Sequence, residues 1–266
     1  MDNNLFLPVY RNIEKEVETL CYSLHCDDKQ TSVYSMKIAE LLVRCCVEIE
    51  SLSKKLYFDN GGIPKPANPD GSENFLQFDS DCINHLNSIW YICSKKVLVV
   101  GVGFFFELPS NKELKPLYNA NKTGNNSWKK AYMAIKHDRQ NNLEKATIKN
   151  LIGALAALYL LNVYNTKNSP IDQQSFKNMT SFDCDSTLFS VKVANIGGCG
   201  VQNDNLTGMD FQDATYLYKY KEQSYEGAAQ ALNALNAQIK DVLFNSFELK
   251  ESYKHHGNSP QPMFLR

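Results

Sequence analysis

Apolar side chains recur at three- and four-residue intervals along the first 165 residues, a spacing that places them on one face of an α-helix. The clearest stripe covers residues 33–57 and predicts a long amphipathic helix, with Thr31 or Ser32 available as its N-cap. A weaker stripe over residues 9–25 predicts another helix, and Pro8 is compatible with it because a proline is tolerated in the first turn. Two amphipathic helices are therefore expected before residue 60.

Three further helices are expected in the next hundred residues. Their patterns cover residues 79–93, 127–135 and 143–164. After Leu151 the last of them is apolar on nearly every face, which is typical of a helix in the middle of a bundle. Residues 60–74 contain three prolines and three glycines and are expected to form a long loop.

Strand patterns are fewer. Residues 96–108 are rich in Val and Phe and interrupted by glycines, so a β-hairpin is predicted there. Residues 188–194 alternate as a short strand, the tyrosines of 216–220 allow another, and 226–250 has helical spacing.

We therefore predict a mainly α protein, an antiparallel helical bundle with a β-hairpin insertion and a small C-terminal α/β appendage. The bundle is expected to comprise residues 1–165 and the appendage residues 166–254. The last residues, 255–266, are expected to form a flexible tail.

Composition narrows the function classes. The chain has 266 residues, 28 basic and 29 acidic side chains, so any attraction to nucleic acid or anionic lipid must be local. No signal-peptide pattern opens the chain, and the longest apolar run, 151–161, is shorter than the ~20 residues of a membrane span. A cytoplasmic protein without membrane association is expected. Its eight cysteines are expected to be reduced and partly buried, because disulfides are rare in that compartment.

Ionisable side chains concentrate in the turn Lys136-His137-Asp138-Arg139, between two predicted helices. Six basic residues and two acidic ones lie between residues 127 and 150, an excess of four positive charges beside an imidazole; the basic set is Lys129, Lys130, Lys136, Arg139, Lys145 and Lys149. Such a cluster suits an anion or phosphate. The alternative is structural: Asp138 caps a helix beginning near Gln140, the lysines form its solvated face and His137 packs at the corner.

Glu48 is a second candidate, since it falls on the apolar side of the 33–57 helix and a carboxylate there needs a partner. Arg44, four residues earlier, is the expected partner, and His137 or Arg139 could approach it from another helix. The alternative is a partly buried ion pair that only orients helices.

Other site motifs are not matched. Gly101 and Gly103 follow an apolar strand, but Phe106 stands where a dinucleotide-binding turn needs its third glycine. The cysteines and histidines form no set of paired metal ligands, so no metal and no cofactor are expected.

The helical core with a charged, His-bearing turn before a long apolar helix resembles the HEPN superfamily of prokaryotic toxins and defence ribonucleases, over residues 33–164. Family members that cleave RNA usually carry an arginine four to six residues before the histidine, here His137, and dimerise so that two motifs face each other. That arginine is not matched, because Lys130, Ala131, Tyr132 and Met133 occupy the places upstream.

The resemblance implies a homodimer in a bacterial defence or stress system that binds RNA, with metal-independent cleavage left open. His137 would then act as general acid or base, the cations Lys130, Lys136, Arg139 and Arg44 would hold phosphate, and Glu48 would orient the imidazole. Two alternatives stay open: a non-enzymatic dimerisation or partner-binding module that uses the 60–74 loop, and a sensor of nucleotides or small molecules.

Overall fold

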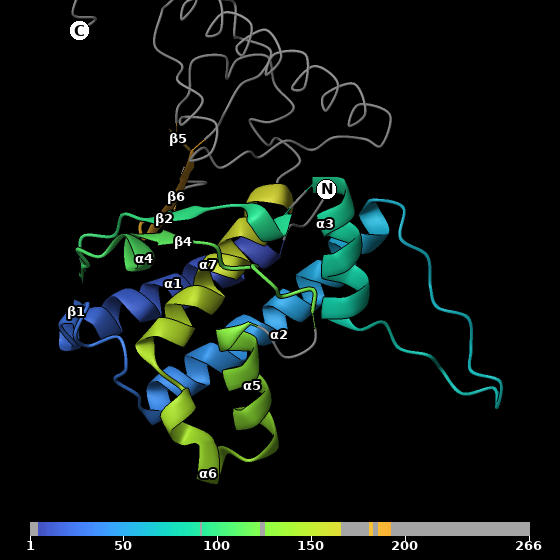
Figure 1. Cartoon of the computed structure of the whole chain (residues 1–266), viewed down its shortest axis with the longest axis horizontal. Coiled ribbons are helices and arrows are strands. Elements are labelled where there is room, and N and C mark those ends of the chain that lie inside the picture. Colours follow the sequence, from blue (N-terminus) through green and yellow to red (C-terminus); the bar gives the residue numbers. More distant parts are fainter. Residues whose placement is uncertain (1–4, 91, 123–125, 166–180, 183–185, 193–266) are drawn as a thin grey trace, which may run out of the picture. The chain divides into compact units, whose positions relative to one another are not determined.

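The structure is a computed structural model that describes residues 5–90, 92–122, 126–165, 181–182 and 186–192. All of these belong to the first of two compact units, Met1–Lys219. Helices dominate the described part of the chain (Figure 1), so the predicted mainly α class is confirmed. The α-helices are α1 (Phe6–Ser23), α2 (Met36–Asp59), α3 (Asn84–Trp90), α4 (Pro109–Lys112), α5 (Ser127–His137), α6 (Arg139–Asn142) and α7 (Ile148–Asn165).

The long helix α2 begins three residues later than its hydrophobic pattern suggests. Ser35, and neither Thr31 nor Ser32, is its N-cap, and the Ser35 hydroxyl accepts a hydrogen bond from the Ile38 amide at 3.2 Å. The residues before it are extended because Tyr34 forms a β-bridge with Thr147, just ahead of α7. A contact between distant segments therefore sets this helix start.

Helices α2 and α7 form the centre of the core, and they run parallel. The Ile148 amide donates to the Val33 carbonyl near their first turns, and Lys55 donates to Asn165 near their last. The prediction of an antiparallel bundle is wrong for this pair. Neighbouring helices can be parallel when a long connection returns the chain to the starting end, and here the connection includes α3, α4, α5 and α6.

The outer helices α1 and α5 run against this central pair. On α1, Asn12 contacts Arg44 and the later Glu16 contacts the earlier Lys37 of α2, so α1 is antiparallel to α2. The short connection through α6 and the 3₁₀ turn Leu143–Lys145 makes α5 antiparallel to α7. As its apolar pattern predicts, α7 is buried along nearly its whole length from Leu151 onward.

The helix predicted at 79–93 is instead broken into three parts, although its apolar stripe is buried as expected. They are a π-helix (Phe78–Ile83), α3 and a 3₁₀ turn (Ile92–Ser94). The Asp81 carboxylate accepts the Gln77 amide at 2.7 Å, and such local side-chain bonds compete with regular helical hydrogen bonding.

The strands are short and form two sheets. They are β1 (Cys26–Asp27), β2 (Val97–Val99), β3 (Phe104–Phe105), β4 (Glu113–Leu114), β5 (Ser181–Phe182) and β6 (Phe189–Lys192). One sheet has the order β4-β2-β6-β5 with antiparallel neighbours, and the other is the parallel pair β1 and β3.

The hairpin predicted at 96–108 is wrong, because its two strands, β2 and β3, lie in different sheets. The amides of Val100 and Gly101 both donate to the Leu188 carbonyl, at 2.9 and 3.2 Å, so this segment pairs with β6 and its approach. A Cβ at Gly101 would lie 2.6 Å from the Leu188 side chain, which explains the glycine at this close approach.

The strand predicted at 188–194 is confirmed as β6. Because β6 pairs with β2, residues 186–192 share a sheet with the segment before residue 100, and the predicted domain boundary at 165 does not separate them. The rest of the predicted appendage, with its 216–220 strand and 226–250 helix, and the predicted tail at 255–266 lie outside the described residues, apart from β5.

Candidate functional site

The predicted Lys-His-Asp-Arg cluster lies where α5 ends and α6 begins (Figure 1). Lys136 and His137 belong to the last turn of α5, Asp138 joins the two helices, and Arg139 is the first residue of α6. All four side chains are exposed. A ligand in solvent can therefore reach the whole turn.

The structural role considered for Asp138 is confirmed, with α6 beginning at Arg139, one residue before the expected start. The Asp138 carboxylate accepts the Asn141 amide at 3.2 Å and the Asn141 side chain at 2.8 Å. These two bonds hold the pKa of Asp138 below its usual value. The carboxylate thus stays charged and is engaged by the backbone of its own turn.

The companion idea, that His137 packs at the corner, is wrong. Its side chain is exposed and makes no hydrogen bond or ion pair with any residue that the structure describes. The imidazole is therefore available to a ligand, but no protein group described here fixes its orientation.

Five cations that lie on α5, on α6 and between α6 and the first turn of α7 make no ion pair with a described residue. They are all exposed: Lys130, Lys136, Arg139, Lys145 and Lys149. The Lys136 ammonium lies 5.3 Å from the centre of the Tyr132 ring, a cation–π contact that orients it without neutralising it. The exposed carboxylates of the same segment are Asp138 and Glu144, so residues 130–149, without the buried Lys129, have a net excess of three positive charges.

Lys129, counted with these cations from the sequence, belongs to the core instead. Its side chain is nearly inaccessible, and its ammonium donates to the Asp79 carboxylate at 3.0 Å and to the carbonyls of Ala120 and Lys122 at 3.0 and 2.6 Å. All three ammonium donors are used. Lys129 therefore ties α5 to the π-helix and to the loop before α5, and it is not part of the exposed surface.

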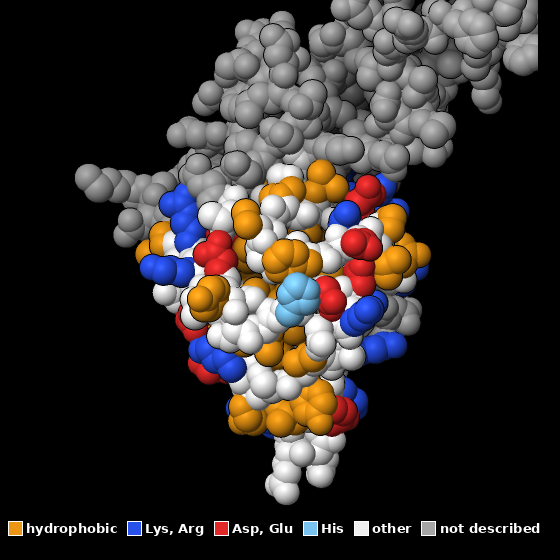
Figure 2. Space-filling model, turned by 90° about the vertical axis from the view of Figure 1, so that its left-hand side faces the viewer, with side chains coloured by type: hydrophobic (Ala, Val, Ile, Leu, Met, Phe, Trp, Pro, Cys, Tyr) orange, Lys and Arg blue, Asp and Glu red, His pale blue; other side chains and the backbone are white. Residues whose placement is uncertain are grey.

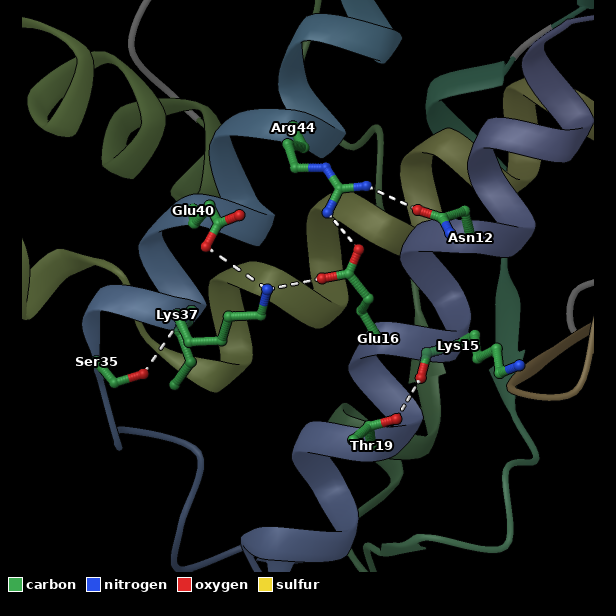
Figure 3. A network of polar contacts seen from close by, with 9 residues as sticks. Asn12, Lys15, Glu16, Thr19, Ser35, Lys37, Glu40 and Arg44 are labelled. Carbon is green, nitrogen blue, oxygen red and sulfur yellow. Dashed lines mark hydrogen bonds and ion pairs between the residues drawn. The ribbon is translucent and has the colours of Figure 1, made fainter.

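Arg44, proposed as a phosphate ligand or as the partner of Glu48, is engaged elsewhere (Figure 3). Its guanidinium donates to the Glu16 carboxylate and, at 2.9 Å, to Asn12, both on α1. Glu16 also accepts from Lys37 at 2.6 Å. The hydrogen bonds from Lys37 and Arg44 hold the pKa of Glu16 below its usual value. The predicted Arg44–Glu48 pair is thus wrong, because a carboxylate on α1 takes the guanidinium.

Glu48 is half-buried on α2, and the structure does not bring it to His137. Helix α5 meets α2 near Glu50, because burial and, after it, the nearby Glu50 charge raise the pKa of Tyr132. Two residues along a helix correspond to about 200° of rotation, so Glu48 points away from the face that meets α5. The predicted set of Glu48, Arg44 and His137 is therefore not assembled within this chain.

Sequence reasoning missed a buried polar cluster around Glu14. The Glu14 carboxylate accepts the Tyr10 hydroxyl at 2.7 Å, the Ser186 hydroxyl, and the Leu188 amide at 3.2 Å. Burial, with Glu14 nearby, raises the pKa of Tyr10 well above its usual value. The sequence feature that could have indicated this cluster is Glu14 itself, a carboxylate within the apolar stripe of α1. Its function is to anchor residues 186–189 against that helix.

A polar pocket beside α3 was also missed. It has a volume of about 450 Å³ and is lined by side chains that include Tyr57, Lys65, Asp81 and His85. The 60–74 loop, which lacks helix and strand as predicted, is held over this region: Tyr57 bonds Ile63, His85 bonds the Asn60 carbonyl, and Lys65 pairs with Asp81 at 2.5 Å. The sequence feature that could have indicated this pocket is His85, the single histidine among residues 79–93.

In the described part of the chain no three His, Cys, Asp or Glu side chains come together as a metal site. None of the described helices is both long and apolar enough to cross a bilayer. Comparison with family models, curated proteins and solved structures finds no match to this chain.

Proposed function

We propose that this chain is a HEPN-like protein of a bacterial defence or stress system that binds RNA, or another phosphate-bearing ligand, through the turn between α5 and α7. One observation carries the proposal: between residues 130 and 149 five cations are exposed and have no ion pairs to described residues. Paired cations, such as Arg44 and Lys129, have carboxylate partners that a phosphate would have to displace. The unpaired ones do not have this competition.

The chemistry of the turn fits a phosphodiester backbone better than a single small anion. Arg139 offers the planar fork that binds phosphate oxygens in pairs, while the lysines are mobile point charges. Each single-stranded RNA phosphate neutralised by such a cation releases counterions, and the binding constant then falls with salt with a slope of about 0.7 per contact. The protein is therefore expected to bind RNA weakly and with strong salt dependence.

Binding without cleavage is the form of this function that the geometry favours. General acid–base catalysis needs an oriented imidazole, and the carboxylate expected to orient His137 lies on another face of α2. The arginine expected upstream of the histidine is replaced, and Arg139 follows it. We therefore assign His137 to ligand contact and leave it without a catalytic role in this proposal.

Fluorescence anisotropy with labelled single-stranded RNA at several salt concentrations tests the proposal. Lys136→Ala and Arg139→Ala are expected to weaken binding, and each is expected to reduce the salt slope by about 0.7. Lys15→Ala is the matched control, since it removes the same charge from an exposed position on α1. Equal weakening by all three variants, or by none, would refute a site at this turn.

Two further arms separate the ligand sources and the enzyme question. If free nucleotides fail to displace the bound RNA, the polymer is identified as the ligand. Incubation with total RNA, beside His137→Ala, tests cleavage. Degradation lost in the variant would make this chain a metal-independent ribonuclease and overturn our assignment, while identical degradation by both proteins would indicate contamination.

The pocket beside His85 supports a second candidate, a partner-binding or small-molecule sensing module. Ile63 in the 60–74 loop and Phe75 just after it are 73% and 68% exposed. Deleting residues 66–74 is then expected to abolish capture of a protein partner, and a panel of nucleotides is expected to shift the thermal midpoint. The HEPN resemblance further implies a homodimer, which sedimentation of the purified chain would detect.

A further inference from the structure

Two cysteines meet where α1 ends and β1 begins. Cys21 lies in the last turns of α1 and Cys26 opens β1, and their Sγ atoms are 2.9 Å apart. A disulfide bond is about 2.05 Å long, so the two sulfur atoms would have to approach each other by about 0.9 Å to form one. The pair is reduced in the structure.

The other four described cysteines have no comparable arrangement. Cys45 and Cys46 are adjacent in α2, where burial raises the pKa of each thiol. Burial likewise raises the pKa of Cys82 and Cys93, each to about 11. Such thiols react slowly, because the thiolate is the nucleophile.

Cys26 differs in its protonation. The hydrogen bond shared with Cys21 lowers the pKa of Cys26, and it raises the pKa of Cys21 well above the usual value. A thiol pair that shares one hydrogen bond can react stepwise: one sulfur attacks as a thiolate, and its neighbour keeps a proton and resolves the product.

The backbone fixes the position of Cys26. Its strand pairs with β3, and two residues later the Asp28 carboxylate accepts the amides of Glu107 and Leu108 at 2.8 and 3.0 Å. Cys21 belongs to the regular helix α1. Both sulfurs are therefore held by secondary structure, and their contact does not depend on a mobile loop.

Both cysteines are buried, with Cys21 6% and Cys26 1% exposed. A Cβ at Gly103 would lie 3.6 Å from the Cys21 Cβ, so the turn at 101–103 packs over this cysteine, and Val102 in that turn is almost fully exposed. Figure 2 shows hydrophobic side chains gathered around a histidine on the side where β1 lies. The His25 ring stacks on the Phe105 ring, with their centroids 4.7 Å apart. Because both side chains are buried, a small oxidant must reach the sulfurs through a local opening of the structure, and the turn beside Cys21 is the nearest exposed segment.

We propose that Cys21 and Cys26 form a redox-active pair that converts to an intramolecular disulfide on exposure to a peroxide. The Cys26 thiolate attacks one peroxide oxygen, the O–O bond breaks, and the other oxygen leaves as hydroxide, which takes up a proton to become water. The Cys21 sulfur then attacks the Cys26 sulfenic acid, the S–O bond breaks, and a second water leaves with the Cys21 proton. The two thiols are oxidised by two electrons and the peroxide is reduced to two waters.

Hydrogen peroxide titration of the full chain, followed by intact mass and peptide mapping after alkylation, tests this inference. The wild type is expected to lose the mass of two hydrogen atoms, to lose two of its eight thiols, and to yield the tryptic peptide of residues 16–29 with Cys21 and Cys26 joined by an internal disulfide. Dithiothreitol is expected to restore both thiols. A protein that keeps all its thiols, or that cross-links other cysteines, would overturn the proposal.

Two variants assign the roles. In Cys21→Ser the oxidised Cys26 has no resolving thiol, so a sulfenic acid that dimedone labels is expected to accumulate. In Cys26→Ser neither the label nor the cross-link is expected at Cys21. Cys45→Ser is the matched control and is expected to form the same disulfide as the wild type. Mapping of the wild type needs no variant, so misfolding of a serine variant does not remove the test.

Discussion

Replacing Lys129 by methionine is expected to destabilise this protein strongly, whereas the same replacement of Lys130 is expected to do little. The two lysines are adjacent in α5, but Lys129 is buried with three acceptors and Lys130 is exposed. Methionine keeps the length of the side chain and most of its packing. The comparison therefore measures the buried ammonium and its hydrogen bonds.

The expected magnitude follows from the partners that Lys129 would leave behind. Removing one member of a buried ion pair costs about 3–5 kcal/mol, because the other charge stays buried and unpaired. The Asp79 side chain is 22% exposed, so water can compensate part of this loss and the lower figure of about 3 kcal/mol applies. For a domain of this size that corresponds to a fall of roughly 6–12 °C in the melting temperature.

Urea denaturation monitored by tryptophan fluorescence would measure both variants. We expect Lys130→Met to change the free energy of unfolding by less than about 0.5 kcal/mol, as surface substitutions usually do. A loss below about 1 kcal/mol for Lys129→Met, or equal losses for the two, would contradict the structural role of Lys129. Lys129 would then rejoin the candidate phosphate ligands.

The pH dependence gives an independent check on the same pair. Burial is the largest single effect and raises the pKa of Asp79, but the hydrogen bond and charge of Lys129, together with backbone hydrogen bonds such as that of Ser80, outweigh it, and the folded-state pKa is lowered. A lowered pKa stabilises the folded state above the unfolded-state value of about 3.9 and loses this effect as the pH falls through the folded-state value. The difference in stability between the wild type and Lys129→Met is thus expected to shrink in acid below about pH 4.

Three smaller predictions use other contacts. Ser35→Ala removes the N-cap of α2 and is expected to cost about 1 kcal/mol in urea denaturation, and an unchanged midpoint would contradict the cap. Tyr10→Phe leaves Glu14 without one donor and is expected to cost about 1 kcal/mol, with faster amide exchange at Leu188; unaltered exchange would argue against the cluster as an anchor. Asp138→Asn keeps a good N-cap but removes a negative charge, so tighter RNA binding with a steeper salt slope is expected, and weaker binding would count against a phosphate site there.

The individual helices could be predicted from the sequence because their signal is local. The stripe at 33–57 corresponds to α2 at Met36–Asp59, and the apolar run after Leu151 corresponds to the buried α7. How these helices meet could not be predicted, since it depends on contacts such as Tyr34 with Thr147, which join segments more than a hundred residues apart. The same limit explains the wrong hairpin, whose first strand pairs with residues near Leu188.

The candidate site shows this limit at the level of single side chains. Lys129 and Lys136 are seven residues apart in α5, so they lie within about 20° of each other around the helix axis. The sequence pattern therefore places both beside the buried face and predicts the same burial for each. One is buried and the other exposed. The difference arises because the π-helix and the loop before α5 cover the first turns of α5, and they supply Asp79 and two carbonyls. No helical pattern contains that information.

The turn between α5 and α7 can attract RNA only over a short distance. The whole chain has a net charge of −1, so the excess of three positive charges at the turn exists because acidic residues are engaged elsewhere, as Glu16 is with Lys37 and Arg44. At physiological salt such a local field decays over about 8 Å, so it cannot steer a ligand from a distance. Binding must then come from direct contacts to a few phosphates. Five single-strand contacts give a salt slope of at most about 3.5, and a larger measured slope would contradict binding through these five cations alone.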